Sequence, residues 1–159
     1  MKVSKRHFAF NFCLIVFPWL SVYFLGKQNF KRYSLAGLTV ILIELISHKI
    51  GQKRKWWIFY DKRKSYLTNE LPFSIGPYMP LSMWLLKRYY GNFTKFLLAN
   101  AVSDALFAFF FINLLEKVRI LKLNKLSNLQ FFVYLYHKAF ILYGVQYLVE
   151  NKMNIKEKL

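Results

Sequence analysis

The segment FTKFLLANAVSDALFAFFFINLL, residues 93–115, decides the fold class of this chain. Apart from Lys95 and Asp104 it carries no charge, and it is rich in phenylalanine, leucine and alanine. An α-helix needs roughly 20 such residues to cross the hydrocarbon core of a bilayer. The segment therefore predicts a membrane-spanning helix.

The composition of the whole chain agrees with this prediction. The protein has 159 residues, of which 56% are hydrophobic and 20% are aromatic. The core of a soluble domain of this length is too small to hide so many large apolar side chains, so much of the apolar surface must face lipid. We therefore expect a single domain, residues 1–159, that resides in a membrane.

Four further apolar runs, three before residues 93–115 and one after, extend the pattern. They occupy residues 8–26, 34–50, 67–86 and 129–149. Each is about long enough to cross a bilayer as a helix. Together the runs predict an all-α integral membrane bundle of about five spans.

The first run, residues 8–26, also begins as a signal peptide does, because basic residues precede it. Phe24 and Leu25 stand where cleavage requires small side chains, so we expect an uncleaved span. Pro18 lies inside this run and predicts a bend in the helix.

The third run, residues 67–86, is interrupted by residues that disturb a helix. These are Pro72, Gly76, Pro77 and Pro80. Proline donates no backbone hydrogen bond and clashes with the preceding turn, so we expect no regular helix between Leu71 and Pro80. The segment is either a kinked span or a re-entrant element, and a re-entrant element would leave four crossings.

Lysine and arginine give the chain a formal net charge of +17. In a soluble protein that surplus would suggest nucleic acid. Here the basic residues lie between apolar runs, which is typical of cytoplasmic loops that face anionic lipid headgroups, so we expect lipid and no nucleic acid. Because the N-terminus and residues 49–66 lie on the more basic side for four or five spans, we expect both to be cytoplasmic. Residues 116–128 alternate apolar and basic residues and predict an amphipathic link on the surface.

Aromatic, glycine and proline residues over residues 56–150 carry a family resemblance. The positions are Trp56, Trp57, Tyr60, Leu71, Pro72, Phe73, Gly76, Pro77, Trp84, Lys87, Tyr90, Gly91, Phe93, Asn100, Asp104, Leu142, Tyr143, Gly144, Gln146 and Tyr147. In this region the chain resembles a family of small polytopic membrane proteins of endospore-forming Gram-positive bacteria. The resemblance implies a bacterial cell membrane and supplies no mechanism.

Polar and ionisable residues inside the apolar runs are the best candidates for a functional site, because a charge in lipid is costly unless it is paired or hydrated. The candidates are Glu44, His48, Asn100, Asp104, His137 and Lys138. Lys138 is about ten residues from either end of its run, or roughly 15 Å, which is farther than a lysine side chain reaches. We expect it to face the bundle interior and to meet Asp104, with Glu44 as the alternative partner.

Sequence signatures of catalysis do not occur in this chain. There is no zinc-protease histidine motif, no nucleophile elbow and no Walker loop. The single cysteine, Cys13, excludes an intrachain disulfide and a multi-cysteine metal site. We therefore expect no catalytic residue, no cofactor and no metal site.

The sequence favours a non-enzymatic multi-pass bacterial membrane protein that acts through contacts with lipid, with a second copy of itself or with another membrane protein. The alternative is a small proton-linked or ion-linked transporter or channel subunit that uses the charges inside its spans. A second alternative is a lipid-modifying enzyme that uses Asp104, His48 and His137. In the non-enzymatic protein the interior charges only stabilise the fold, whereas in the transporter or channel they conduct protons or ions.

Overall fold

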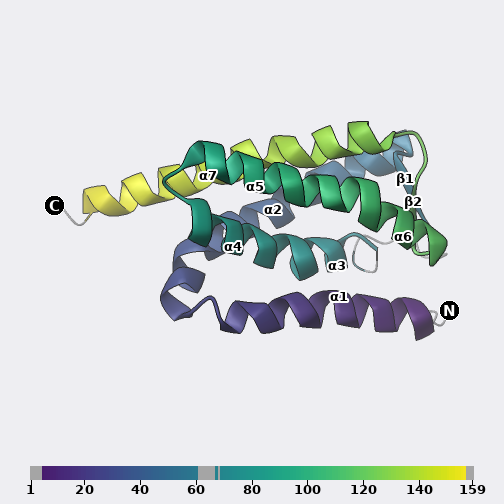
Figure 1. Ribbon diagram of the computed structural model, residues 1–159, viewed down its shortest axis with the longest axis horizontal. Coiled ribbons are helices and arrows are strands. Elements are labelled where there is room, and N and C mark those ends of the chain that lie inside the picture. The colour runs from purple at the N-terminus through teal and green to yellow at the C-terminus, as the bar shows by residue number, and fades with distance from the viewer. Residues whose placement is uncertain (1–4, 61–66, 68, 157–159) are drawn as a thin grey trace.

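The computed structural model of the protein describes residues 5–60, 67 and 69–156 and is 82% helical, with five helices (Figure 1). Their segments are α1 (Lys5–Tyr23), α2 (Lys27–Arg54), α3 (Leu71–Phe73) with η1 (Ser74–Tyr78) and α4 (Met79–Tyr89), α5 (Phe93–Ala105) with η2 (Leu106–Phe111) and α6 (Ile112–Lys117), and α7 (Asn128–Lys156). The helical prediction is thus confirmed for most of the chain.

Successive helices run in opposite directions along one bundle (Figure 1). At one end, Gly26 with a φ of 85° and Gly91 with a φ of 95° form the turns after α1 and α4. Glycine adopts this left-handed conformation without a steric penalty, so both connections can be short. We call this end the turn end, and the opposite end, which holds the two strands, the strand end.

Two helices are long and apolar enough to cross a membrane, namely Lys27–Arg54 and Phe93–Lys117. Only 33% and 22% of their most apolar stretches are buried within the protein. The core helix of a soluble protein would be mostly buried, and Phe93–Lys117 lies too far from the N-terminus to be a signal sequence. These two helices favour a membrane protein.

Two short strands correct the purely helical prediction. β1 (Trp57–Phe59) pairs antiparallel with β2 (Leu121–Leu123), so that Trp57 opposes Leu123 and Phe59 opposes Leu121. Alternate residues of a strand share a face, and here that face packs on the apolar core at the strand end. The expected surface link at residues 116–128 therefore folds back into the protein over part of its length.

The charged segment predicted as a loop at residues 49–66 is also shorter than expected. α2 continues to Arg54, where Lys55 adopts a left-handed conformation with a φ of 55° and its N–H caps the helix. Residues 61–66 lie outside the described residues.

The third run is helical but irregular, as the prolines predicted. Residues 71–89 form one continuous helix that crosses the bundle, and η1 within it has π-helical hydrogen bonds (Figure 1). In this register the Met79 N–H donates to the Ser74 carbonyl, and Pro80 has no N–H to offer the Ile75 carbonyl. Trp19 Nε1 of α1 donates to that carbonyl at 2.9 Å. The irregular turn therefore ties α1 to the bundle, and the segment does not turn back on itself.

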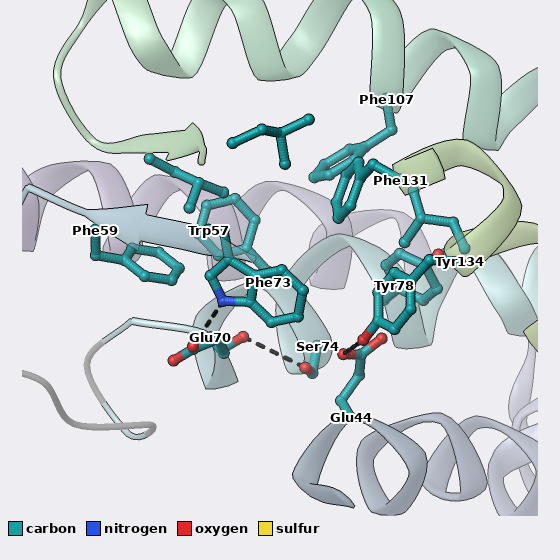
Figure 2. Close-up of a pocket in the computed structure, with 13 residues that line it drawn as sticks. Glu44, Trp57, Phe59, Glu70, Phe73, Ser74, Tyr78, Phe107, Phe131 and Tyr134 are labelled. Atoms are coloured by element: carbon teal, nitrogen blue, oxygen red, sulfur yellow. Dashed lines mark hydrogen bonds between the residues drawn. The ribbon is translucent and has the colours of Figure 1, made fainter. Parts of the chain in front are cut away.

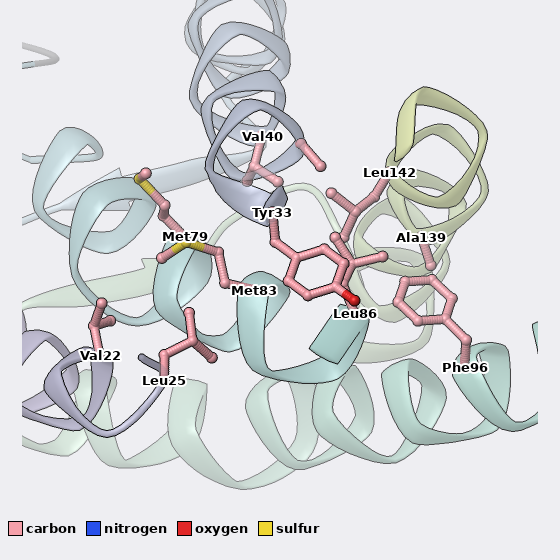
Figure 3. Close-up of a cluster of buried hydrophobic side chains, with 11 residues drawn as sticks. Val22, Leu25, Tyr33, Val40, Met79, Met83, Leu86, Phe96, Ala139 and Leu142 are labelled. Atoms are coloured by element: carbon pink, nitrogen blue, oxygen red, sulfur yellow. The ribbon is translucent and has the colours of Figure 1, made fainter. Parts of the chain in front are cut away.

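Two apolar clusters form the core. The cluster nearer the turn end is drawn in Figure 3 and contains Val22, Leu25, Tyr33, Ala36, Val40, Met79, Met83, Leu86, Phe96, Ala139 and Leu142. The cluster at the strand end contains Phe73, Ala108, Ile112, Leu115, Ile120, Leu121, Phe131 and Leu135. Tyr78 packs against both clusters, so the polar residues around it lie between the two apolar halves.

Substitution of Gly76 with alanine tests the close packing of α1 on η1. An added Cβ would lie 3.0 Å from the Leu14 carbonyl carbon and nearer still to its oxygen, and backbone cannot rotate away as a side chain can. We expect Gly76→Ala to lower the free energy of unfolding in detergent by about 1 to 3 kcal/mol. Gly144→Ala is the matched control, because nothing lies within 4 Å of its added Cβ. Equal stability of the two variants would refute this packing.

Candidate functional site

An ion pair between Lys138 of α7 and Glu44 of α2 lies in the interior of the bundle. The Lys138 side chain is only 3% exposed and that of Glu44 is 14% exposed. The partner of Lys138 is thus Glu44, the second of the two carboxylates expected from the sequence, and Asp104 has a different hydrogen-bond donor. A buried ammonium group without such a partner would be strongly destabilising.

Two tyrosines surround the Lys138 ammonium group. Its nitrogen lies 3.8 Å from the ring centroid of Tyr134 and 5.6 Å from that of Tyr78. A cation over the face of an aromatic ring is stabilised, most of all where water is excluded. The Tyr134 hydroxyl also donates to Glu44 Oε2 at 3.3 Å, so this residue contacts both members of the pair.

Asp104 of α5 joins the site through Tyr78. The Tyr78 hydroxyl donates to Asp104 Oδ1 at 3.3 Å, and Asp104 is 7% exposed. Asn100, one turn earlier, is also buried, but its amide donates to the Phe96 carbonyl of its own helix at 2.8 Å. Tyr78 therefore links the carboxylate on α5 to the lysine on α7.

A second carboxylate centre, which the sequence analysis did not single out, lies beside α3. Glu70 Oε1 is 2.8 Å from His48 Nδ1 and accepts a hydrogen bond from Trp57 Nε1 at 3.1 Å. Trp57 can lie here because its ring packs directly on Gly51 of α2, where an added Cβ would overlap it. Figure 2 shows Trp57 above Glu70, with Glu44 and Tyr134 at the other side of the same pocket.

The pocket between these groups has a volume of about 60 Å³, which is room for a few water molecules. It is lined mainly by aromatic rings, with Glu44 and Glu70 among its polar residues (Figure 2). Glu70 Oε2 is buried without a hydrogen-bond partner among the described residues. The pocket can hold a few water molecules and is too small for a lipid or a cofactor.

His137 lies apart from the site, contrary to its inclusion among the candidates. Its side chain is on the exposed face of α7, where its ring is 5.8 Å from that of Tyr134. Adjacent residues of a helix point about 100° apart, and here Lys138 and Ala139 face the interior while His137 lies outside that face. His48, Asp104 and His137, which carried the enzyme alternative, thus contact different groups.

Carboxylates outnumber cations in this interior. The described interior contains three carboxylates, those of Glu44, Glu70 and Asp104. The cationic or basic side chains beside them are Lys138 and His48. Among the residues that the structure describes, no three histidine, cysteine, aspartate or glutamate side chains are placed to hold a metal ion. Each carboxylate meets a partner from another segment of the chain, so the arrangement is suited to pairing helices.

A separate polar contact joins α2 to α7 at the turn end. Arg32 Nε lies 2.5 Å from Glu150 Oε1, and Gln146 Nε2 donates to the same carboxylate at 2.8 Å. Glu150 lies beyond the predicted fifth span. The hydrogen bonds from Arg32 hold the pKa of Glu150 below its usual range.

Similarity to known proteins provides no evidence on the function of this chain. No protein-family model, curated protein or solved structure matches the chain. The family resemblance described from the sequence therefore remains a prediction. Any function has to be argued from the contacts described above.

A double-mutant cycle on Lys138→Met and Glu44→Gln tests the interior ion pair. Each single change leaves one buried group without its partner, so we expect a loss of about 3 to 5 kcal/mol in the free energy of unfolding in detergent. The double variant should recover part of that loss. His137→Met is the matched control on α7 and should change stability by less than about 0.5 kcal/mol. Additive losses in the cycle would show that the two groups do not interact.

The pH dependence of stability tests the contact at Glu150. Because its folded-state pKa is depressed, its stabilising effect is present above the unfolded pKa, near 4.3, and is lost as the pH falls through the folded value. We expect wild type to melt at a higher temperature than Glu150→Gln at neutral pH, and the difference to vanish in strong acid. A difference that does not depend on pH would contradict this assignment.

Proposed function

We propose that the protein is a multi-pass bacterial membrane protein that acts without catalysis. It acts through contacts of its lipid-facing surface and of the basic residues at the strand end. The observation that carries the proposal is the distribution of exposed apolar side chains over all five helices. Examples are Phe17 at 68% exposure, Ile46 at 65%, Leu81 at 40%, Phe110 at 71% and Leu148 at 61%. In water such a surface would aggregate, whereas lipid or a membrane partner covers it at no cost.

The filled interior supports a role in contacts over one in conduction. The two apolar clusters and the ion pair between them occupy the centre of the bundle, and the pocket beside the pair holds only a few waters. A single copy therefore has no ligand-sized pathway among its described residues. Contacts with lipid, with a second copy or with another membrane protein use the outer faces instead.

The proposal includes an orientation. The strand end carries basic residues on three elements, among them Lys53 of α2, Lys117 of α6 and Lys122 of β2. Basic residues concentrate on the cytoplasmic side of membrane proteins, so this end and the N-terminus would be cytoplasmic. The antiparallel course of the five helices favours five crossings, with the C-terminus outside.

One observation favours proton-linked transport as a second candidate. Tyr134 donates to Glu44, the partner of Lys138, and Tyr78 donates to Asp104, so two carboxylates, one lysine and two tyrosine hydroxyls gather in the interior. A multimer would be needed to enclose a pathway. Proton flux into vesicles that is lost in Asp104→Asn, with the bundle still folded, would favour this candidate over contacts alone.

Single-cysteine labelling tests membrane residence and orientation together. Cys13 is first replaced with serine, and cysteine is then placed at Lys31, at the turn end, or at Lys55, at the strand end. An impermeant maleimide should label Lys31→Cys in intact cells and Lys55→Cys only after the membrane is opened. Labelling of Lys55→Cys in intact cells would reject the orientation. If neither variant remains with membranes after alkaline extraction, the membrane proposal is wrong.

A further inference from the structure

A second and larger cleft opens at the strand end, on the side of Glu70 away from the interior pocket. Its volume is about 730 Å³, within the range of small-molecule sites in proteins. Its described lining comes from the end of α2, from β1 and from the residues before α3: Lys49, Gln52, Lys53, Lys55, Trp57, Ile58, Phe59, Asn69 and Glu70. The membrane proposal above would place it at the level of the lipid headgroups.

Three ammonium groups line this cleft. Lys49 and Lys53 are one turn apart on α2, so they share a face, and Lys55 follows at the end of the helix. All three are exposed, and none forms an ion pair with a carboxylate of the described residues. Cations near a helix C-terminus complement its dipole, which accounts for Lys53. The helix dipole does not account for the cleft or for three lysines around it. A bound anion among the lysines accounts for both.

The inner wall of the cleft has a different chemistry. Trp57 and Phe59 supply aromatic surface, and Glu70 supplies a carboxylate whose Oε2 atom is buried and has no donor among the residues that the structure describes. His48 and Trp57 already contact the other oxygen, Oε1, and Figure 2 shows the hydrogen bond from Trp57. Glu70 lines the cleft beyond the lysines, so a ligand that extends past them approaches a carboxylate that can accept a hydrogen bond. A free phosphate ion uses only the lysines, whereas a phosphate with a hydroxyl group beyond it uses both.

The lipid-facing side of α2 continues from the cleft. Ile50, Ile46 and Leu42 follow at intervals of one turn and are 44%, 65% and 61% exposed. They form an apolar stripe that runs from the lysines towards the middle of the helix. Acyl chains can lie along this stripe while their headgroup occupies the cleft, so the geometry suits an intact lipid.

We propose that this cleft binds a phosphatidylglycerol-type headgroup, with the phosphate among Lys49, Lys53 and Lys55 and a glycerol hydroxyl donated to Glu70. The proposal rests on the membrane function above and adds a specific ligand to it. Lipid binding at this site fixes the position of α2 relative to the start of α3, because Lys49 and Lys53 belong to α2 and Glu70 precedes α3.

Titration of the purified protein in detergent with short-chain lipids tests the site. Dihexanoyl phosphatidylglycerol is compared with the phosphatidylmethanol of equal charge, which has no headgroup hydroxyl, and with phosphatidylcholine. We expect phosphatidylglycerol to bind at least about fivefold more tightly than phosphatidylmethanol, as one additional hydrogen bond provides. Phosphatidylcholine should bind more weakly than both. Glycerol 3-phosphate without acyl chains should bind weakly, and equal affinity for it would show a site for free phosphate instead.

The variant Lys49→Gln/Lys53→Gln/Lys55→Gln should lose roughly 100-fold in affinity for phosphatidylglycerol, at about 1 kcal/mol per lysine. The matched control removes three charges at the turn end, Lys27→Gln/Lys31→Gln/Lys95→Gln, and should lose less than about threefold. Equal losses in the two variants would show non-specific attraction and overturn the site. If the wild-type protein is embedded in membranes but does not discriminate among these lipids, the headgroup proposal fails and the membrane function stands. If it does not enter membranes, the membrane function itself fails.

Discussion

The contact between Lys138 and Glu44 is the interaction on which the rest of the bundle depends. It joins α7 to α2 across the interior, and the residues beside it belong to different apolar clusters: Leu135 to the strand-end cluster, Ala139 to the other. Apolar packing alone permits helices to rotate or slide. A buried charge has one acceptable partner, so the pair fixes the rotation and depth of both helices. Tyr78 and Tyr134 then place η1 and the rest of α7 around the same ammonium group.

Irregular backbone in the third helix has a structural role of the same kind. Pro80 leaves the Ile75 carbonyl without a backbone donor. The side chain of Trp19 in α1 donates to this carbonyl instead. Gly76 lets the backbones of η1 and α1 approach closely at that level. A buried carbonyl without a donor is costly, so this hydrogen bond and the close approach at Gly76 hold α1 against η1. The prolines thus determine the packing of a helix distant in sequence.

The sequence predicts the helices well because each apolar run is long and contains few charges. It also predicts that Lys138 needs an interior partner, since a lysine side chain is too short to reach the interface from that depth. It favours Asp104 over Glu44 as that partner, and this preference is wrong, because the choice depends on which helices are neighbours and on where Tyr78 points. It also groups His137 with Lys138, although adjacent residues of a helix point about 100° apart and need not share a face.

Glu70, Trp57 and the two strands were missed for a common reason. Each contributes through a partner far along the chain: Trp57 opposes Leu123 in the sheet, and Glu70 meets His48. The strands have three residues each, and the apolar and basic residues that alternate over residues 116–128 fit a surface link as well as a strand. Only the closed bundle brings these residues to the boundary between the small interior pocket and the basic cleft.

Solid-state NMR of the protein in lipid bilayers tests the interior ion pair most directly. With lysine labelled at ¹⁵Nζ and glutamate at ¹³Cδ, the Lys138 and Glu44 pair should give a strong short-range dipolar correlation. This correlation should disappear in Lys138→Met and in Glu44→Gln and persist in Asp104→Asn. If it is missing from the wild-type spectrum, or survives Lys138→Met, then α2 and α7 are not joined by this pair and the packing of the bundle described here is wrong.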